Sequence, residues 1–432
     1  MSDSLIAVNI ENLNAEEIFS HLPANRVGKI DRLYVQEVLD DGFGNTKDPA
    51  NISCRFESAF AQKFGVGYAI SHNSGSGTML SCLLAAGVGP GDEVIVPTLT
   101  AAPTAFVVVE CGAVPVFADS NADTFCIDPK DIERRLTEHT RAIIPVSIYG
   151  LSPDYDSIMK TAERYRLTVI EDNAQCFLGA YKGRRVGAIG QAASFSFQGS
   201  KHMTSGGDGG MVITNDEEYA RDIRKHCSQG FRTLTGRAGN TVIPRDTRQD
   251  WSFERHDRLG YNFHMSPMQA ALGLAQLQRL EFLVAARRYI ASQYESVIRD
   301  EKCEWLIAPY VPGDSVHVFW SYTCKLNEKL LGVSWQEFRR TFIQNGGDGL
   351  YGAWRPVHLE PIFQTMAFYG SSDRAPNFDP RYKGKVKSYK EGDCPVIEKL
   401  QRCLCQFKTS MQTLDKVNRQ ADALRKTIRY YA

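Results

Sequence analysis

Residues 167–201 read LTVIEDNAQCFLGAYKGRRVGAIGQAASFSFQGSK, and this stretch decides the fold. It contains two short, β-rich apolar runs, 167–172 and 193–197, each followed by polar or small residues. Runs of this kind are typical of strands that are buried on both faces of a parallel sheet. Open α/β sheets bind their ligands beyond the carboxyl ends of such strands, so the residues after each run are candidate site residues.

The same alternation of apolar runs and helical stretches continues on both sides of this segment. Further strands are expected at 67–71, 93–97, 114–119, 141–147 and 210–216, with helices ending near 112 and lying near 155–166. This alternation predicts an α/β fold in which a mostly parallel sheet is sandwiched by helices. After about residue 310 the pattern becomes α+β, with a strand at 317–325 and helices at 334–345 and 407–430. We predict an N-terminal arm and large domain over 1–300 and a small C-terminal domain over 301–432.

Two further segments flank this pattern. A long helix is predicted near 266–290, because Ser266 is a good N-cap, Pro267 suits the first helical position and Gln269 completes a capping box. The segment 231–258 is polar and rich in Arg and Thr, which predicts an excursion loop. The first 60 residues predict little beyond a helical arm.

Composition and charge exclude several classes of protein. The 432-residue chain has 50 basic and 50 acidic residues, so it lacks the net positive charge that draws nucleic-acid binders to phosphate backbones. Its 43% of hydrophobic and 23% of charged residues are typical of a globular protein. The apolar stretches fall short of the roughly 18 residues that span a bilayer, and the acidic start does not resemble a signal peptide.

The 11 cysteines are an odd number, lie scattered along the chain and include no CxxC pair. Such a set indicates reduced thiols rather than a disulfide framework or a zinc site. We therefore expect a cytoplasmic protein with no structural metal and no membrane partner.

The first chemical signal is the turn Ser74-Gly75-Ser76-Gly77-Thr78, between a predicted strand and a predicted helix. Glycines let the backbone close on an anion, and a helix N-terminus presents free N–H groups to a phosphate. The turn matches neither the Walker A nor the GxGxxG pattern. A plain strand-to-helix turn fits the same residues equally well.

The second signal is Asp172, at the end of the run TVIED, with Gln175 three residues later. A carboxylate at a strand end is often only a helix cap. The alternative is a partner for a cationic ring nitrogen, which the carboxylate would keep protonated so that the ring can accept electrons.

The third signal is Lys201 in SFSFQGSKHMTSGGDGG. Most lysines are solvated surface charges, but this one follows a strand and precedes a run of small residues and glycines. A lysine in such a setting loses its proton more easily and can form a Schiff base. Taken together, the three signals require a phosphate, a cationic heteroaromatic nitrogen and a carbonyl. Pyridoxal phosphate supplies all three, whereas NAD needs no lysine of this kind.

With these motifs the chain resembles the DegT/StrS-type sugar aminotransferases, which are fold-type I pyridoxal-phosphate enzymes. The resemblance rests on IEDNAQ, on SFSFQGSK with Lys201 placed 29 residues after Asp172, and on LGYNFHMSPMQAALGLAQL at 259–277. It covers residues 30–300 well and the C-terminal part loosely. It implies a mostly parallel seven-stranded sheet in the large domain.

The resemblance also implies roles for individual residues. Lys201 is expected to form the Schiff base with the cofactor and later to move protons. Asp172 is expected to pair with the pyridine nitrogen, and Gln175 to lie near the ring hydroxyl.

The remaining cofactor contacts implied by the resemblance concern the phosphate. Ser76, Gly77 and Ser196 are expected to hold it. Asn262, in the GYN part of the signature, is expected to reach the phosphate of a neighbouring subunit. The active enzyme is therefore expected to be a homodimer with shared active sites.

Two residues depart from the family pattern or invite an alternative. Where relatives place an aromatic residue that stacks on the cofactor ring, this chain has Ala101. His202 follows Lys201, and some relatives that carry histidine in place of the lysine are deoxysugar dehydratases. Because the lysine is in register here, the resemblance favours a transaminase over a dehydratase.

The expected reaction moves an amino group from glutamate or glutamine to a keto-sugar in amino-sugar or polysaccharide biosynthesis. The acceptor is a nucleotide-linked keto-sugar, a free oxo-sugar or a keto-inositol. The segment GLYGAWRPVHLEP at 349–361 lies where relatives approach the site. Arg355 could pair with an anion, and Trp354 or His358 could contact a sugar, although a surface loop with packing aromatics fits as well.

Overall fold

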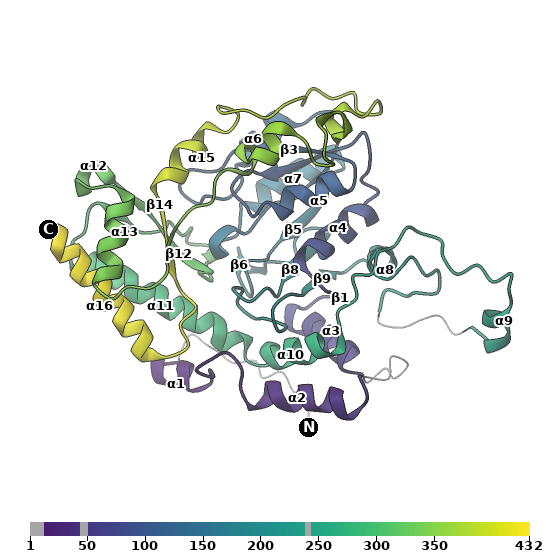
Figure 1. The fold of residues 1–432 in the computed structure, drawn as a ribbon, viewed down its shortest axis with the longest axis horizontal. Helices are drawn as coiled ribbons and strands as arrows, with labels where there is room; N and C mark the ends of the chain where they lie inside the picture. Colours follow the sequence, from purple (N-terminus) through teal and green to yellow (C-terminus); the bar gives the residue numbers. More distant parts are fainter. Residues whose placement is uncertain (1–12, 44–50, 238–242) are drawn as a thin grey trace.

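The computed structural model describes residues 13–43, 51–237 and 243–432 (Figure 1). The predicted N-terminal arm contains three helices, α1 (Ala15–Ser20), α2 (Lys29–Asp40) and α3 (Ile52–Phe64). The parts of the arm prediction that concern 1–12 and 44–50 lie outside the described residues.

A seven-stranded sheet forms the centre of the molecule, in the order β1-β9-β8-β5-β4-β2-β3. The five strands from β8 to β3 are parallel, and β9 joins β8 and β1 by antiparallel pairing. The bounds are β1 (Tyr68–His72), β2 (Glu93–Pro97), β3 (Val114–Ala118), β4 (Thr140–Ile143), β5 (Thr168–Asp172), β8 (Ala192–Ser196) and β9 (Gly210–Thr214). The predicted α/β class and mostly parallel sheet are confirmed.

Helices cover this sheet and explain its apolar sequence. Every residue of β2, β3 and β9 is buried, as expected for strands with a helix layer on each face. The helices that pack against its strands are α3, α4 (Gly75–Ala85), α5 (Pro103–Glu110), α6 (Pro129–Arg135), α7 (Tyr155–Tyr165) and α8 (Glu217–Cys227).

A smaller antiparallel sheet, in the order β10-β12-β14-β13, follows in the C-terminal part. Its strands are β10 (Leu306–Ile307), β12 (Ser321–Leu326), β13 (Leu350–Gly352) and β14 (Leu404–Lys408). Helices α11 (Leu280–Asp300), α13 (Trp335–Gln344) and α16 (Leu414–Tyr431) pack together beside it (Figure 1). This confirms the predicted smaller α+β part.

The two parts of the chain are also joined by strand pairing. A third sheet pairs β11 (Ser315–Val316) with β6 (Ala180–Tyr181), which in turn pairs with β7 (Arg184–Arg185). The position of a domain boundary at residue 300 stays a prediction.

Two predicted helices are wrong in extent. The helix near 266–290 is two helices, α10 (Pro267–Leu277) and α11, although the predicted capping box of Ser266 and Gln269 is present. The break lies at Arg279, whose guanidinium bonds the buried carboxylate of Asp31 at 2.8 Å. The helix predicted at 407–430 begins at residue 414, because the alternating stretch at 404–408 forms β14 in the sheet.

The predicted excursion at 231–258 is confirmed, with the short helix α9 (Arg245–Gln249) at its far end. It projects away from the body of the molecule, and its residues 238–242 are not described (Figure 1). Trp251, directly after α9, is 93% exposed.

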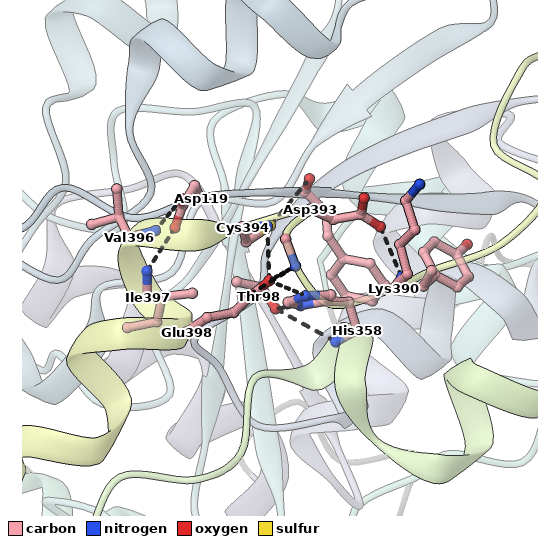
Figure 2. A network of polar contacts seen from close by, with 12 residues as sticks. Thr98, Asp119, His358, Lys390, Asp393, Cys394, Val396, Ile397 and Glu398 are labelled. Carbon is pink, nitrogen blue, oxygen red and sulfur yellow. Dashed lines mark hydrogen bonds and ion pairs between the residues drawn. The ribbon is translucent and has the colours of Figure 1, made fainter.

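The segment between β13 and β14 returns to the edge of the large sheet. It contains α14 (Pro361–Thr365) and α15 (Pro395–Leu400). The carboxylate of Asp119, just after β3, accepts hydrogen bonds from the N–H groups of Val396 and Ile397 at 2.8 and 3.0 Å (Figure 2). Two N–H groups of the first turn of α15 are thereby satisfied by a residue of the large sheet.

Candidate active site

Lys201 lies in a turn beyond the carboxyl end of β8, where its N–H donates to the carbonyl of Gln198 at 2.8 Å. The residue is 9% exposed, and its Nζ lies 5.1 Å from the centroid of the Trp320 ring. Burial lowers the pKa of the amine to about 8; the charge of Arg287 lowers it further, and Asp172 opposes the shift. A larger fraction of the amine than of an ordinary lysine is therefore neutral, and able to act as a nucleophile, near neutral pH.

Asp172 ends β5 and is buried. One carboxylate oxygen accepts a hydrogen bond from the Thr104 hydroxyl at 2.9 Å, and the other accepts one from the N–H of Ala174 at 3.1 Å. Burial raises the pKa of Asp172, while these two donors and the charge of Lys201 lower it. A buried carboxylate that is hydrogen-bonded only by neutral groups would gain from a cationic ring nitrogen beside it.

The turn at 74–77 begins α4. Ser74 is the N-cap, and its hydroxyl accepts a hydrogen bond from the N–H of Gly77 at 3.1 Å. The N–H groups of Gly75 and Ser76, in the first helical turn, have no partner within the helix and are available to an anion. A Cβ on Gly75 would lie 2.8 Å from the Cβ of Ser196, so the end of β8 lies directly against this turn.

Gln175 and Asn262, two further expected cofactor residues, differ in their burial. Gln175 is buried, and its side-chain oxygen accepts a hydrogen bond from the N–H of Tyr149 at 2.7 Å, in the turn after β4. Asn262 is exposed, and its carbonyl accepts a hydrogen bond from the Asn73 side chain at 3.5 Å. Asn262 therefore lies next to the 74–77 turn of its own chain.

The structure separates the three residues that were expected to contact substrate. Trp354 is 46% exposed, and its ring lies 6.3 Å from that of Trp320. Arg355 is exposed. Trp354 and Trp320 line a cavity of about 500 Å³, together with Ser200, Arg287, Ser321, Tyr351, Gly352, Gln406, Phe407, Lys408, Thr409 and Ser410.

His358, by contrast, lies in the interior of the molecule. Its Nδ1 is 2.6 Å from the Thr98 hydroxyl and its Nε2 is 2.9 Å from a Glu398 carboxylate oxygen (Figure 2). Glu398 also accepts hydrogen bonds from the N–H groups of Gly392 and Cys394. Both ring nitrogens of His358 thus tie the C-terminal segment to the end of β2. A role for His358 toward substrate stays a prediction.

Two positions singled out in the sequence also have a clear setting. Ala101 lies two residues before α5, and the ring of Trp320, from the C-terminal half of the chain, lies beside the Lys201 amine. The His202 ring is buried 5.5 Å from the ring of Phe177, with Nε2 3.1 Å from the carbonyl of Val318.

Sequence reasoning missed Thr100, Thr104, Arg287 and Trp320. The Thr100 and Thr104 hydroxyls lie 2.9 Å apart and lead to Asp172. No local motif marks Thr104, Arg287 or Trp320, because they reach Asp172 or the Lys201 turn across 68 or more positions of the chain.

Within the described residues, no three His, Cys, Asp or Glu side chains are placed to hold a metal ion. In the same part of the chain, no helix has the length and apolar character to cross a membrane. All 11 cysteines are free thiols.

These residues fit pyridoxal phosphate. Carbon added at Gly75 or at Gly210 would approach other atoms to 2.8 or 2.6 Å, so the turn after β1 is a close-packed cradle that only glycines allow. Beyond the same sheet edge lie a buried amine of lowered pKa and a buried carboxylate whose hydrogen bonds come from neutral donors. On one cofactor, an aldehyde would suit the Lys201 amine, a ring nitrogen the Asp172 carboxylate, and a phosphate the 74–77 turn.

Comparison with known proteins agrees with this site. A model of the DegT/DnrJ/EryC1/StrS aminotransferase family matches residues 26–382. GDP-perosamine synthase of Caulobacter vibrioides is 38% identical over 344 residues, covering 80% of this chain and 86% of that protein. The L-glutamine:2-deoxy-scyllo-inosose aminotransferase of Streptomyces lividus is 37% identical over 343 residues, covering 77% of each. The structure of an aminotransferase from Psychrobacter cryohalolentis has a TM-score of 0.81 at 28% identity, covering 94% of this chain and 98% of that one.

The fold and the site define a pyridoxal-phosphate enzyme of fold-type I. The chain belongs to the DegT/DnrJ/EryC1/StrS aminotransferase family, and it is a pyridoxal-phosphate-dependent sugar aminotransferase of amino-sugar and polysaccharide biosynthesis. The predicted family, fold class, reaction type and cofactor are thereby confirmed.

Proposed function

We propose that this enzyme moves the amino group of glutamate or glutamine onto the keto group of a sugar, with Lys201 as the residue that carries the cofactor and moves protons. The observation that supports this most is the buried Lys201 amine of lowered pKa, together with the buried Asp172 carboxylate whose charge acts on it. Nucleotide-linked keto-hexoses and keto-inositols are both candidate acceptors, because relatives above 35% identity are named for GDP-perosamine and for 2-deoxy-scyllo-inosose.

When bound, pyridoxal phosphate supplies the aldehyde that takes up the amino group and a ring that withdraws electrons. Asp172 would hold a proton on the ring nitrogen, and Thr104 would fix the Asp172 carboxylate. Ser76, Gly77 and Ser196 would hold the phosphate, and Gln175 would face the ring hydroxyl. The Lys201 amine would take the proton from the donor's α-carbon and pass it to the former aldehyde carbon of the cofactor, a task worth about 10² to 10⁴ in rate.

The acceptor sugar would lie against the Trp320 and Trp354 rings, in the cavity that borders the Lys201 turn. Exposed aromatic side chains at a concave surface suit a sugar ring, which stacks its C–H face on an aromatic face. Arg355, exposed beside Trp354, would pair with an anionic group of the acceptor.

The reaction is tested by following the absorbance of the bound cofactor. Addition of glutamate or glutamine should convert the band of the lysine-bound cofactor into that of the amine form, and a keto-sugar acceptor should restore it. Keto-hexoses with and without nucleotide, and keto-inositols, then identify the acceptor. A spectrum that several amino donors leave unchanged would contradict the proposal.

We also propose that the enzyme is a cytoplasmic homodimer whose active sites are shared. Helix α2 exposes Ile30, Leu33 and Leu39 by 40% or more, and apolar groups of this kind suit an interface. Asn262 is exposed beside the phosphate turn, where a partner chain could reach it. The free cysteines agree with a reducing compartment.

Shared sites are tested by mixing two inactive variants, Lys201→Ala and Asn262→Asp. After exchange of subunits, one of the two sites of a mixed dimer contains both wild-type residues, so activity should return. Sedimentation of the wild-type chain at the mass of a monomer, or no return of activity in mixed dimers, would contradict the proposal.

A further inference from the structure

The turn that carries Lys201 is held by two arginines from distant parts of the chain. All four carbonyl groups of residues 199–202 accept hydrogen bonds from them. Arg26, in the segment before α2, donates to the carbonyls of Gly199, Lys201 and His202, at 2.9 Å for Lys201 and 3.3 Å for His202. Arg287, on α11, donates to the carbonyls of Ser200 and Lys201, each at 3.1 Å.

Arg287 also connects this turn to the smaller sheet. Its other terminal nitrogen donates to the carbonyl of Trp320 at 2.7 Å and to the Thr409 hydroxyl at 3.0 Å. The Trp320 indole N–H in turn donates to the carbonyl of Ser200 at 3.0 Å. The turn, the Trp320 ring and the end of β14 are therefore fixed relative to one another through one guanidinium.

The charge of the two arginines is not balanced locally. Among the described residues, neither Arg26 nor Arg287 forms an ion pair with a carboxylate, and Arg287 is only 4% exposed. Burial first, and then the charge of Arg26, lower the pKa of Arg287 to about 9. Buried charges are costly in free energy unless they are paired, and here two guanidiniums lie close together without a carboxylate. This cost indicates that they have a function beyond packing.

We propose that Arg287, together with Arg26, is a positioning residue for Lys201: it fixes the turn through its carbonyl groups and places uncompensated positive charge beside the amine. This inference rests on the proposed role of Lys201. The ordered turn keeps the amine directed along the Trp320 ring and toward Asp172, and the charge favours the neutral amine over the ammonium.

The groups that face the Lys201 amine set the direction of this effect. Asp172 from β5 raises the pKa of Lys201, whereas burial and Arg287 from α11 lower it. The neighbouring His202 stays neutral, because burial holds its pKa well below the usual value. At a pKa of about 8, roughly a quarter of the amine is neutral at pH 7.5, against about 0.1% at an ordinary lysine pKa of about 10.4.

The inference is tested on the full chain after pyridoxal phosphate has been removed with hydroxylamine. Competitive acetylation with trace acetic anhydride, read by mass spectrometry of the Lys201 peptide, gives the pH at which this amine is half-neutral. The wild type should give a midpoint near pH 8. Arg287→Met should move the midpoint upward by about one pH unit, because it removes a nearby positive charge.

Three variants make the test specific. Arg287→Lys keeps a basic group but not the paired hydrogen bonds, so the midpoint should rise less than in Arg287→Met while amide exchange of the turn becomes faster. Arg26→Met removes the hydrogen bonds of the other arginine, so amide exchange of the turn should become faster there too. Arg185→Met is the control, because Arg185 also donates to a loop carbonyl, that of Leu178, but is not among the charges that shift the pKa of Lys201.

An unchanged midpoint in Arg287→Met with folding intact, or unchanged amide exchange of the turn in Arg26→Met, overturns the inference. So does a rise of the same size in Arg185→Met. The labelling needs neither cofactor nor substrate, so its outcome is separate from that of the amino-donor experiment, which tests the proposed function itself.

Discussion

Replacing Thr104 by valine removes the hydroxyl that donates to the Asp172 carboxylate at 2.9 Å and preserves the shape of the side chain. A hydrogen bond to a charged group contributes about 1.5–3 kcal/mol. Both residues are buried, so water does not readily replace the lost donor. We therefore expect Thr104→Val to lower the free energy of unfolding by about 1.5–3 kcal/mol at pH 7.5.

The decrease in the free energy of unfolding caused by Thr104→Val should depend on pH. Burial, the largest effect, raises the pKa of Asp172 in the native state above its value in the unfolded chain. The native state then binds the proton more tightly, so the cost of burying the carboxylate is largest above the native pKa and falls as the carboxyl is protonated. The difference between wild type and Thr104→Val should therefore be larger at pH 7.5 than near pH 4.

Urea unfolding of the cofactor-free chain at several pH values measures this difference. Thr161→Val is the control, because Thr161 is also a buried threonine whose hydroxyl donates to a carboxylate, that of Glu133 at 3.2 Å. Thr104→Val should in addition release pyridoxal phosphate more readily, while Thr161→Val should retain it. A difference that does not shrink at low pH, or equal cofactor loss in both variants, would refute the reasoning about Asp172.

Two further substitutions test other parts of the site. Gly75→Ala places a Cβ 2.8 Å from that of Ser196, so the phosphate cradle must shift, and equilibrium dialysis should show cofactor affinity reduced about tenfold or more. His358→Gln breaks the buried link to Glu398 and should lower the unfolding free energy by about 1–3 kcal/mol, with the KM for the acceptor sugar unchanged. A raised KM with unaltered stability in His358→Gln would instead show that His358 contacts the substrate. Undiminished cofactor affinity in Gly75→Ala would contradict the assignment of the 74–77 turn as the phosphate site.

The large sheet could be predicted from the sequence because its strands are continuous apolar runs. The run 93–97 is β2 to the residue, and the neighbouring runs are correct to within a few positions. The smaller sheet was largely missed, since β13 has three residues and β14 reads as the start of a helix. The break at Arg279 could not be seen either, because no Gly or Pro marks it. The ion pair that Arg279 forms there involves Asp31, from the other end of the chain.

Some residues of the candidate site could likewise be predicted from local sequence, and others could not. Lys201, Asp172 and the 74–77 turn follow local rules, since each lies just after a strand. Trp320 and Arg287 reach the site from the C-terminal half through contacts that leave no local pattern. His358 was marked by its residue type, but its burial between Thr98 and Glu398 depends on how the segment before β14 returns to the large sheet.

The most direct test of the whole account is reduction of the cofactor-loaded enzyme with borohydride, followed by mapping of the modified peptide. The account predicts that pyridoxal phosphate becomes permanently attached to Lys201, and that Lys201→Ala abolishes this attachment while the chain stays folded. Attachment to a different lysine, or equal attachment in Lys201→Ala, would contradict the central claim.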